Sequence, residues 1–216
     1  MSTAAPAPGG PHPSDPETLV LHGLRLKAFP DTDVLAVAVG LPEAQVQAAL
    51  EAFAADGLVR RVEGAHVTGW SLTADGRREG EARLAAELHA AGAREAVRDA
   101  YGRFVALNPE LLAVCTDWQM RGDDVNDHTD AAYDQAVVLR LVALHDRVRP
   151  VLADLRRPLA RFAPYSPRLR SALEKVTEGE RDWFTKPTID SYHSVWFELH
   201  EDLLATLGLE RAKEAP

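Results

Sequence analysis

The sequence has little that would suit a secreted or membrane protein. Only one of its 216 residues is a cysteine, Cys115, which excludes an intramolecular disulfide and any zinc site built from several cysteines. No apolar run approaches the ~20 residues needed to span a bilayer, and the N-terminus lacks the basic and apolar regions of a signal peptide. We therefore expect a bacterial, cytoplasmic protein that does not associate with a membrane.

Positive charge is also scarce. The chain has 24 Lys and Arg against 33 Asp and Glu, a formal net charge of -9. Residues 17–90 hold seven Lys and Arg against eleven Asp and Glu, so this segment is itself near -4. Because Lys and Arg supply most of the non-specific affinity for DNA, a DNA-binding role here depends on a local basic patch.

Known catalytic signatures are missing as well. There is no Gly-rich phosphate loop, no nucleophile elbow and no HExxH zinc motif. Cys115 ends the apolar run Leu111–Cys115, which favours a buried structural thiol over a nucleophile partnered by His128. We expect a protein that is not an enzyme; a small-molecule enzyme in the C-terminal half, with His and acid groups in hydrogen-bond reach, is the weaker alternative.

The segment from Leu58 to Arg77 is the most informative part of the chain. The run Leu58–Val62, which contains the β-branched Val59 and Val62, predicts a strand, Glu63-Gly64 predicts a turn, and His66–Leu72 predicts the returning strand. Thr73 suits the N-cap of a helix from Ala74 to Ala90, because its hydroxyl can accept from free backbone amides.

Three helix patterns precede this hairpin. They fall at residues 17–28, 34–39 and 43–56, and Gly40-Leu41-Pro42 separates the last two. In the third helix Val46, Leu50 and Phe53 share one face, which we expect to be buried. The order helix, turn, helix, hairpin, helix is that of a winged helix-turn-helix.

The segment Leu72–Arg77, LTADGR, together with the helix-turn-helix, closely resembles MarR-type bacterial regulators over about residues 17–90. The resemblance implies double-stranded DNA as a partner and a homodimer. The third helix would then lie in the major groove, although it contains no Lys or Arg. The expected DNA-contacting residues are Gln45, Gln47, Arg60, Arg61 and His66. In the alternative interpretation, the acidic winged helix docks a protein instead.

The remaining chain predicts helices and no strand. We expect three regions: a disordered tail over 1–16, the winged-helix domain over 17–90, and an all-helical effector or dimerisation domain over 91–216. The expected fold class is therefore mainly α with one small β-hairpin. The C-terminal helices are expected at 93–105, 109–119, 129–156, 167–178 and 187–207, with Asp127 or Thr129 as the cap of the third.

Aromatic residues, histidines and acids gather in the C-terminal domain, as in many ligand pockets. The candidate effector-binding residues are Trp118, Tyr133, His145, Asp190, His193, Trp196 and His200. The same histidines could instead be core residues whose nitrogens bond within the fold. A metal site is conceivable only if separate helices bring His145 and His193 together with Asp134 or Asp190, because no i, i+4 ligand pair is present. No cofactor is predicted with certainty.

Together these patterns predict a homodimeric, DNA-binding transcriptional regulator. An unknown small-molecule effector would bind between helices 129–156 and 187–207 and shift the population of DNA-binding arrangements. A winged-helix interaction module that serves a partner enzyme is the alternative.

Overall fold

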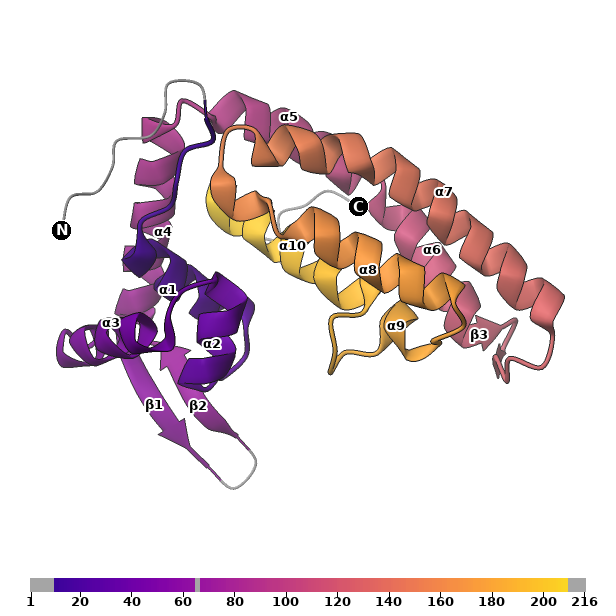
Figure 1. Ribbon diagram of the computed structural model, residues 1–216, viewed down its shortest axis with the longest axis horizontal. Coiled ribbons are helices and arrows are strands. Elements are labelled where there is room, and N and C mark those ends of the chain that lie inside the picture. The colour runs from indigo at the N-terminus through magenta and orange to yellow at the C-terminus, as the bar shows by residue number, and fades with distance from the viewer. Residues whose placement is uncertain (1–9, 65–66, 210–216) are drawn as a thin grey trace. The chain divides into compact units, whose positions relative to one another are not determined.

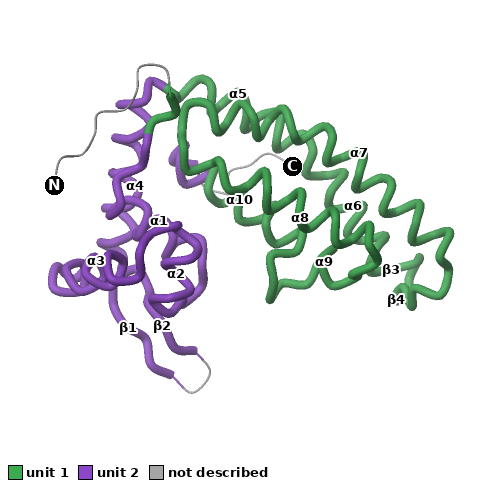
Figure 2. The backbone as a smooth tube through the Cα atoms, in the orientation of Figure 1, with its two compact units in different colours: residues 1–12, 93–203 green, residues 13–92, 204–216 purple. Residues whose placement is uncertain are grey.

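A computed structural model describes residues 10–64 and 67–209 of the chain. The chain divides into two compact units (Figure 2). The N-terminal unit comprises Pro13–Gly92 with Leu204–Pro216, and the helical unit comprises Met1–His12 with Ala93–Leu203.

The N-terminal unit contains four helices and one antiparallel hairpin in its described residues (Figure 1). Their order is α1 (Pro16–Leu26), α2 (Thr32–Val39), α3 (Glu43–Ala55), β1 (Val59–Glu63), β2 (Thr68–Leu72) and α4 (Ala74–Ala90). The hairpin pairs Val59 with Leu72 at its base. The positions of these helices, and the bounds of α4 in particular, confirm the helix predictions for this region.

The turn between α2 and α3 follows from its residue types. Gly40 ends α2 in the left-handed region at φ 69°, where glycine carries no steric penalty, and Pro42 precedes the first turn of α3. The three apolar residues predicted to share a face of α3 are all buried, and they form one core with α1, α2 and the hairpin. Burial of this stripe fixes which face of α3 remains exposed.

The junction between the hairpin and α4 explains the LTADGR segment. The Thr73 hydroxyl accepts from the Gly76 amide at 3.0 Å and donates to the Gly57 carbonyl at 2.8 Å, so Thr73 is the predicted N-cap. The Thr73 amide donates to the Leu58 carbonyl at 3.0 Å. A Cβ at position 76 would lie 1.9 Å from that carbonyl oxygen. Only glycine therefore fits at Gly76.

The helical unit is built from packed helices, in which α7 packs against α5, α6 and α8. Its elements are α5 (Arg94–Val105), α6 (Asn108–Gln119), β3 (Met120–Arg121), β4 (Asp124–Val125), α7 (Ala131–Arg156), a 3-10 turn (Ala160–Phe162), α8 (Tyr165–Thr177), α9 (Asp182–Thr185) and the part of α10 (Tyr192–Leu207) up to Leu203. The protein is thus mainly helical, with two small two-stranded antiparallel sheets. Among the described residues, no helix combines the length and the apolar character needed to cross a membrane.

A buried ion pair holds α10 to the chain before α8. Arg161 donates to Asp202, and both side chains are only 3% exposed. The Tyr165 hydroxyl donates to the other carboxylate oxygen of Asp202 at 2.8 Å. The guanidinium of Arg161 also lies over the Phe162 ring, 4.4 Å from its centroid. Two charges and a hydroxyl therefore satisfy one another inside an apolar core.

Three expectations for the C-terminal domain are wrong in detail. Strands β3 and β4 form a hairpin closed by the turn Gly122-Asp123, where the sequence predicts no strand. Each strand has only two residues, which is too short to show alternation of apolar and polar side chains. The cap of α7 is Asp130, which accepts from the amides of Ala132 and Tyr133. The expected helix 187–207 begins only at Tyr192, after the separate short α9.

The prediction of a disordered tail over residues 1–16 is wrong for its last residues, which are ordered. Pro16 is the first residue of α1, and the Asp15 side chain caps it by accepting from the Thr18 amide. His12 pairs with the backbone around Leu159 in a parallel bridge, donating to the Pro158 carbonyl at 2.8 Å. That contact joins residues far apart in the sequence, so composition alone could not reveal it. Residues 1–9 lie outside the described part of the chain.

Candidate functional site

The exposed face of α3 is the surface expected to meet DNA. Gln45, Ala48 and Glu51 are exposed on it, and Gln47 is half-buried at its edge. The helix carries no Lys or Arg along its whole length. This face therefore offers amide and carboxylate groups and methyl groups, but no cation for phosphate.

The two arginines of β1 differ in their environment. Arg61 donates to Asp31 at 2.9 Å, lies 4.0 Å from a carboxylate oxygen of Glu63, and has its guanidinium 5.8 Å from the centroid of the Trp70 ring. Arg60 is exposed and forms no ion pair with any described residue. Arg60 is thus the more available of the two for a phosphate. His66, the remaining expected contact, lies outside the described residues.

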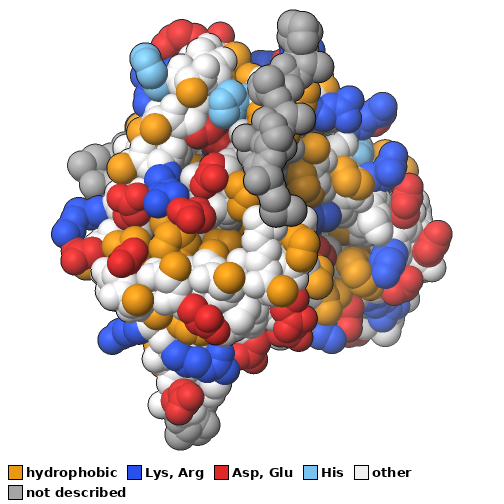
Figure 3. Space-filling view, turned by 60° about the vertical axis from the view of Figure 1, so that its left-hand side comes forward, with side chains coloured by type: hydrophobic (Ala, Val, Ile, Leu, Met, Phe, Trp, Pro, Cys, Tyr) orange, Lys and Arg blue, Asp and Glu red, His pale blue; other side chains and the backbone are white. Residues whose placement is uncertain are grey.

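Charges of both signs are interspersed on the face drawn in Figure 3, which shows no broad basic field. On α4, Arg78 pairs with Asp75, while Arg25 of α1 pairs with Glu81 at 2.6 Å. Most basic groups of the N-terminal unit are therefore already neutralised by acids. DNA affinity from this unit would depend on a few arginines, chiefly Arg60 and Arg77, which are both exposed and form no ion pair with any described residue.

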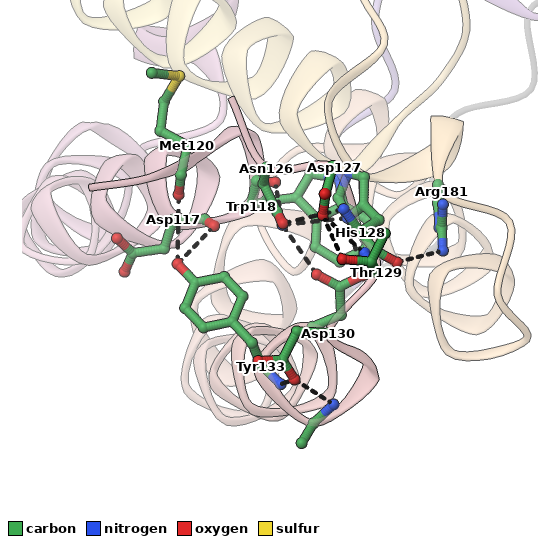
Figure 4. Close-up of polar contacts among 12 residues, drawn as sticks. Asp117, Trp118, Met120, Asn126, Asp127, His128, Thr129, Asp130, Tyr133 and Arg181 are labelled. Carbon is green, nitrogen blue, oxygen red and sulfur yellow. Dashed lines mark hydrogen bonds and ion pairs between the residues drawn. The ribbon is translucent and has the colours of Figure 1, made fainter. Parts of the chain in front are cut away.

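A second polar site lies in the helical unit, where the β3–β4 hairpin meets the start of α7 (Figure 4). His128 places Nδ1 2.9 Å from an oxygen of Asp134. The Asn126 side-chain amide donates to the other oxygen of Asp134 at 2.9 Å and to the Trp118 carbonyl at 3.1 Å. The Asn126 side-chain oxygen accepts from the His128 amide at 3.1 Å. Asn126 therefore fixes both members of an imidazole–carboxylate pair.

The backbone and the aromatic neighbours hold His128 as well. Its φ is 59°, a left-handed conformation that is uncommon outside glycine. Its ring lies 4.5 Å from the Trp118 ring, centroid to centroid, and Trp118 stacks on Phe184 at 4.4 Å. Arg181 donates to the His128 carbonyl at 3.1 Å. A histidine fixed by so many contacts has little freedom to rotate.

The carboxylate decides what this histidine can do. The Asn126 amide nitrogen also lies 3.2 Å from Nδ1, but the charged Asp134 oxygen is nearer, at 2.9 Å. The carboxylate therefore favours the tautomer protonated on Nδ1, which leaves Nε2 as the hydrogen-bond acceptor. The side chains of His128 and Asp134 remain 19% and 13% exposed. Such a pair can accept a hydrogen bond from a ligand or move a proton, and it has the reach that the weaker enzyme alternative requires.

The seven candidate effector-binding residues do not gather at one place. Trp118 belongs to the His128 cluster, and Tyr133 lies beside it, donating to the Asp117 and Met120 carbonyls at 3.0 and 3.3 Å. Asp190 is held by Arg168 at 2.9 Å. His193 is half-buried, and burial lowers its pKa.

The other three candidates are buried within the helical unit. His145 lies 3.2 Å from the Tyr192 hydroxyl, and desolvation lowers its pKa. Trp196 stacks on Phe104 at 4.5 Å and donates to Asn108 at 2.8 Å. His200 lies 3.5 Å from Asn108 through Nδ1. These contacts resemble those of core residues that satisfy one another.

No metal centre is visible in residues 10–64 and 67–209, because no group of three or more His, Cys, Asp or Glu side chains there could hold an ion. Two of the acids considered for such a site have other partners. Asp134 contacts His128, and Asp190 contacts Arg168.

Sequence reasoning missed Asn126, His128 and Arg168 as members of polar sites. From the sequence, Asp127 is expected to be a helix cap and His128 a disfavoured partner of Cys115, and Asp127 does cap locally by accepting from the Thr129 amide at 3.0 Å. The signal in the sequence is the spacing of three polar residues: Asn126 stands two residues before His128 and eight before Asp134. Arg168 donates to Asp190 and Glu198, contacts that span 22 and 30 residues and leave no local pattern.

Cys115 is buried, as the sequence indicated, and burial raises the pKa of its thiol from 9.0 to about 12. A raised pKa stabilises the fold below pH 9, and this contribution is lost as the pH rises toward 12. We expect the unfolding free energy to fall by about 1 kcal/mol more between pH 8 and pH 10 than it does in Cys115→Ala. Urea unfolding at both pH values measures the difference. An equal change in unfolding free energy between pH 8 and pH 10 for the two proteins would contradict the prediction.

No family model matches the chain, and neither a curated protein nor a solved structure is similar enough to it to indicate a relative.

Proposed function

We propose that the protein is a DNA-binding transcriptional regulator, MarR-like in its N-terminal unit. It would act as a homodimer, with an effector response in the helical unit. One observation carries the proposal: two helices joined by the Gly40–Pro42 turn precede a paired hairpin on which Arg60 is exposed without an acidic partner among the described residues. This is the order of elements in which the second helix enters the major groove and the hairpin follows the backbone.

The roles in the proposed interface follow from exposure and charge. Gln45 on α3 presents an exposed amide suited to base edges, and Arg60 presents a guanidinium suited to phosphate. The Gln47 amide, also expected to contact bases, already bonds to Thr32 and Glu51, so its role in the interface is to hold Glu51. Arg61 can contribute after exchanging Asp31 for a phosphate. Because one unit offers so few cations, two copies on a two-fold site would double a weak attraction.

Binding of purified full-length protein to genomic fragments at two or more salt concentrations tests the proposal. We expect fragment-selective binding that weakens with salt. Arg60→Ala should lower affinity on all fragments and reduce the slope of log affinity against log salt by about 1 for each phosphate that Arg60 neutralises. Arg78→Ala is the matched control, since Arg78 already pairs with Asp75. Binding that Arg60→Ala leaves unchanged would remove the hairpin from the interface.

A protein-docking role for the same unit is the second candidate. On α2 the residues Val34 and Val37 are 52% and 85% exposed, next to a helix α3 that lacks cations. Exposed apolar side chains of this kind are common at protein interfaces. If the protein binds no DNA at low salt, either alone or with small molecules from a cell extract added to supply an effector, the docking role is favoured over the first.

A further inference from the structure

Four side chains form a hydrogen-bonded chain from the core of the N-terminal unit to the exposed face of α3. The Nε1 of buried Trp70 donates to the Thr32 hydroxyl at 3.2 Å, and that hydroxyl donates to Gln47 Oε1 at 2.9 Å. Gln47 Nε2 then donates to Glu51 Oε1 at 2.7 Å. The chain thus links strand β2, helix α2 and two successive turns of α3.

The direction of this chain is determined by its two ends. An indole N–H can only donate and a carboxylate can only accept, so Thr32 accepts from Trp70 and Gln47 turns its NH2 group toward Glu51. The Gln47 oxygen then faces Thr32 and accepts the proton of its hydroxyl. The amide cannot flip without breaking both hydrogen bonds. The carboxylate of Glu51 is consequently held by a donor whose orientation is fixed from the core.

Glu51 itself is unusual for an exposed acid. It forms no ion pair with any described residue, although its carboxylate is fixed by Gln47. One oxygen accepts from Gln47, and the remaining lone pairs are open to solvent on the face that carries Gln45 and Ala48. A carboxylate that is fixed in place but has no cationic partner is a selective acceptor for an amino group.

We propose that Glu51 is a specificity-determining residue that accepts a hydrogen bond from the exocyclic amine of cytosine in the major groove, with Gln47 and Thr32 as positioning residues. This rests on the proposed DNA-binding function. Phosphates repel a carboxylate brought into the groove, so Glu51 costs affinity at every site that lacks a donor opposite it. Cytosine N4 supplies that donor, and the pairing of Glu with cytosine is geometrically favourable. The acid therefore rejects wrong sequences as well as selecting the right one.

Selection of bound duplexes from a random-sequence pool tests the assignment. The proteins are wild type, Glu51→Gln and Glu43→Gln; the last removes one exposed acid from the same helix outside the chain of hydrogen bonds. We expect wild type to select cytosine at one position of each half-site, by about tenfold or more over other bases. Both variants should bind non-specific DNA more tightly, since each removes a negative charge. Only Glu51→Gln should abolish the cytosine preference.

Variants of Thr32 test whether its hydroxyl positions Glu51 through Gln47 or only supports the fold. Thr32→Val removes the hydroxyl but keeps the side-chain shape, so cytosine discrimination should fall while non-specific affinity stays constant. Thr32→Ser restores the hydroxyl and should restore discrimination.

The possible results distinguish failure of DNA binding from failure of the role assigned to Glu51. If wild type binds no DNA at low salt, the proposed function itself fails. If wild type binds selectively but Glu51→Gln selects the same bases, or if Glu51 correlates with a base other than cytosine, the role of Glu51 is overturned and DNA binding stands.

Discussion

Replacing Gly76 with alanine is expected to lower the free energy of unfolding of the N-terminal unit by on the order of 3 kcal/mol. The added Cβ would lie 1.9 Å from the Leu58 carbonyl oxygen and 2.8 Å from its carbon, and both are backbone atoms. That carbonyl cannot withdraw easily, because it accepts from the Thr73 amide at 3.0 Å. Either the hairpin or the first turn of α4 must shift. Urea unfolding followed by circular dichroism measures the destabilisation.

Gly80, one turn further along α4, is the matched control for this substitution. A Cβ at position 80 would meet only the Leu21 Cβ at 3.6 Å, an ordinary van der Waals contact. Gly80→Ala should therefore raise stability by up to about 1 kcal/mol, because alanine favours the helix. Similar effects of the two substitutions would mean that the close approach at Gly76 is not what requires glycine there.

Replacing Asp202 with alanine is expected to destabilise the helical unit by about 3–5 kcal/mol. The change leaves the Arg161 guanidinium buried without its carboxylate and takes the acceptor from the Tyr165 hydroxyl. Burial, the largest cause of the raised pKa of Tyr165, remains in the variant, so the phenol does not ionise to compensate the arginine near neutral pH. Thermal unfolding of the full chain measures the effect.

Two further variants show whether the buried charge is the cause. The double variant Arg161→Met/Asp202→Leu should be more stable than Asp202→Ala, because it removes both buried charges together. Asp146→Ala breaks the exposed pair with Arg149 and should change stability by less than about 0.5 kcal/mol. A double variant no better than Asp202→Ala would attribute the destabilisation to packing alone.

The features that the sequence predicted well are local. Thr73 caps α4, and the buried stripe Val46, Leu50, Phe53 follows helical spacing; both depend on residues within a few positions of one another. The mainly helical fold follows from the same periodicity. Even the missed β3–β4 hairpin had a local signal in Gly122-Asp123, although strands of two residues show no alternation.

The site features that the sequence did not reveal are determined by contacts between distant residues. Arg161 and Asp202 are 41 positions apart, and Phe184 reaches Trp118 from a different helix. The candidate effector residues were grouped because they are aromatic, basic or acidic and lie on helical faces. Helical spacing places a residue on a face but not opposite a partner, so it could not show that Asp190 would meet Arg168 or that His145 would meet Tyr192.

The single cysteine has a practical consequence for spectroscopy. Cys115 is buried and its thiol stays protonated near neutral pH, so maleimide reagents, which need an accessible thiolate, should leave it unmodified in the folded protein. A second cysteine placed at an exposed position such as Arg78 would then be the only site labelled. Fluorophores or spin labels can thus be attached to the natural chain without first replacing its own thiol.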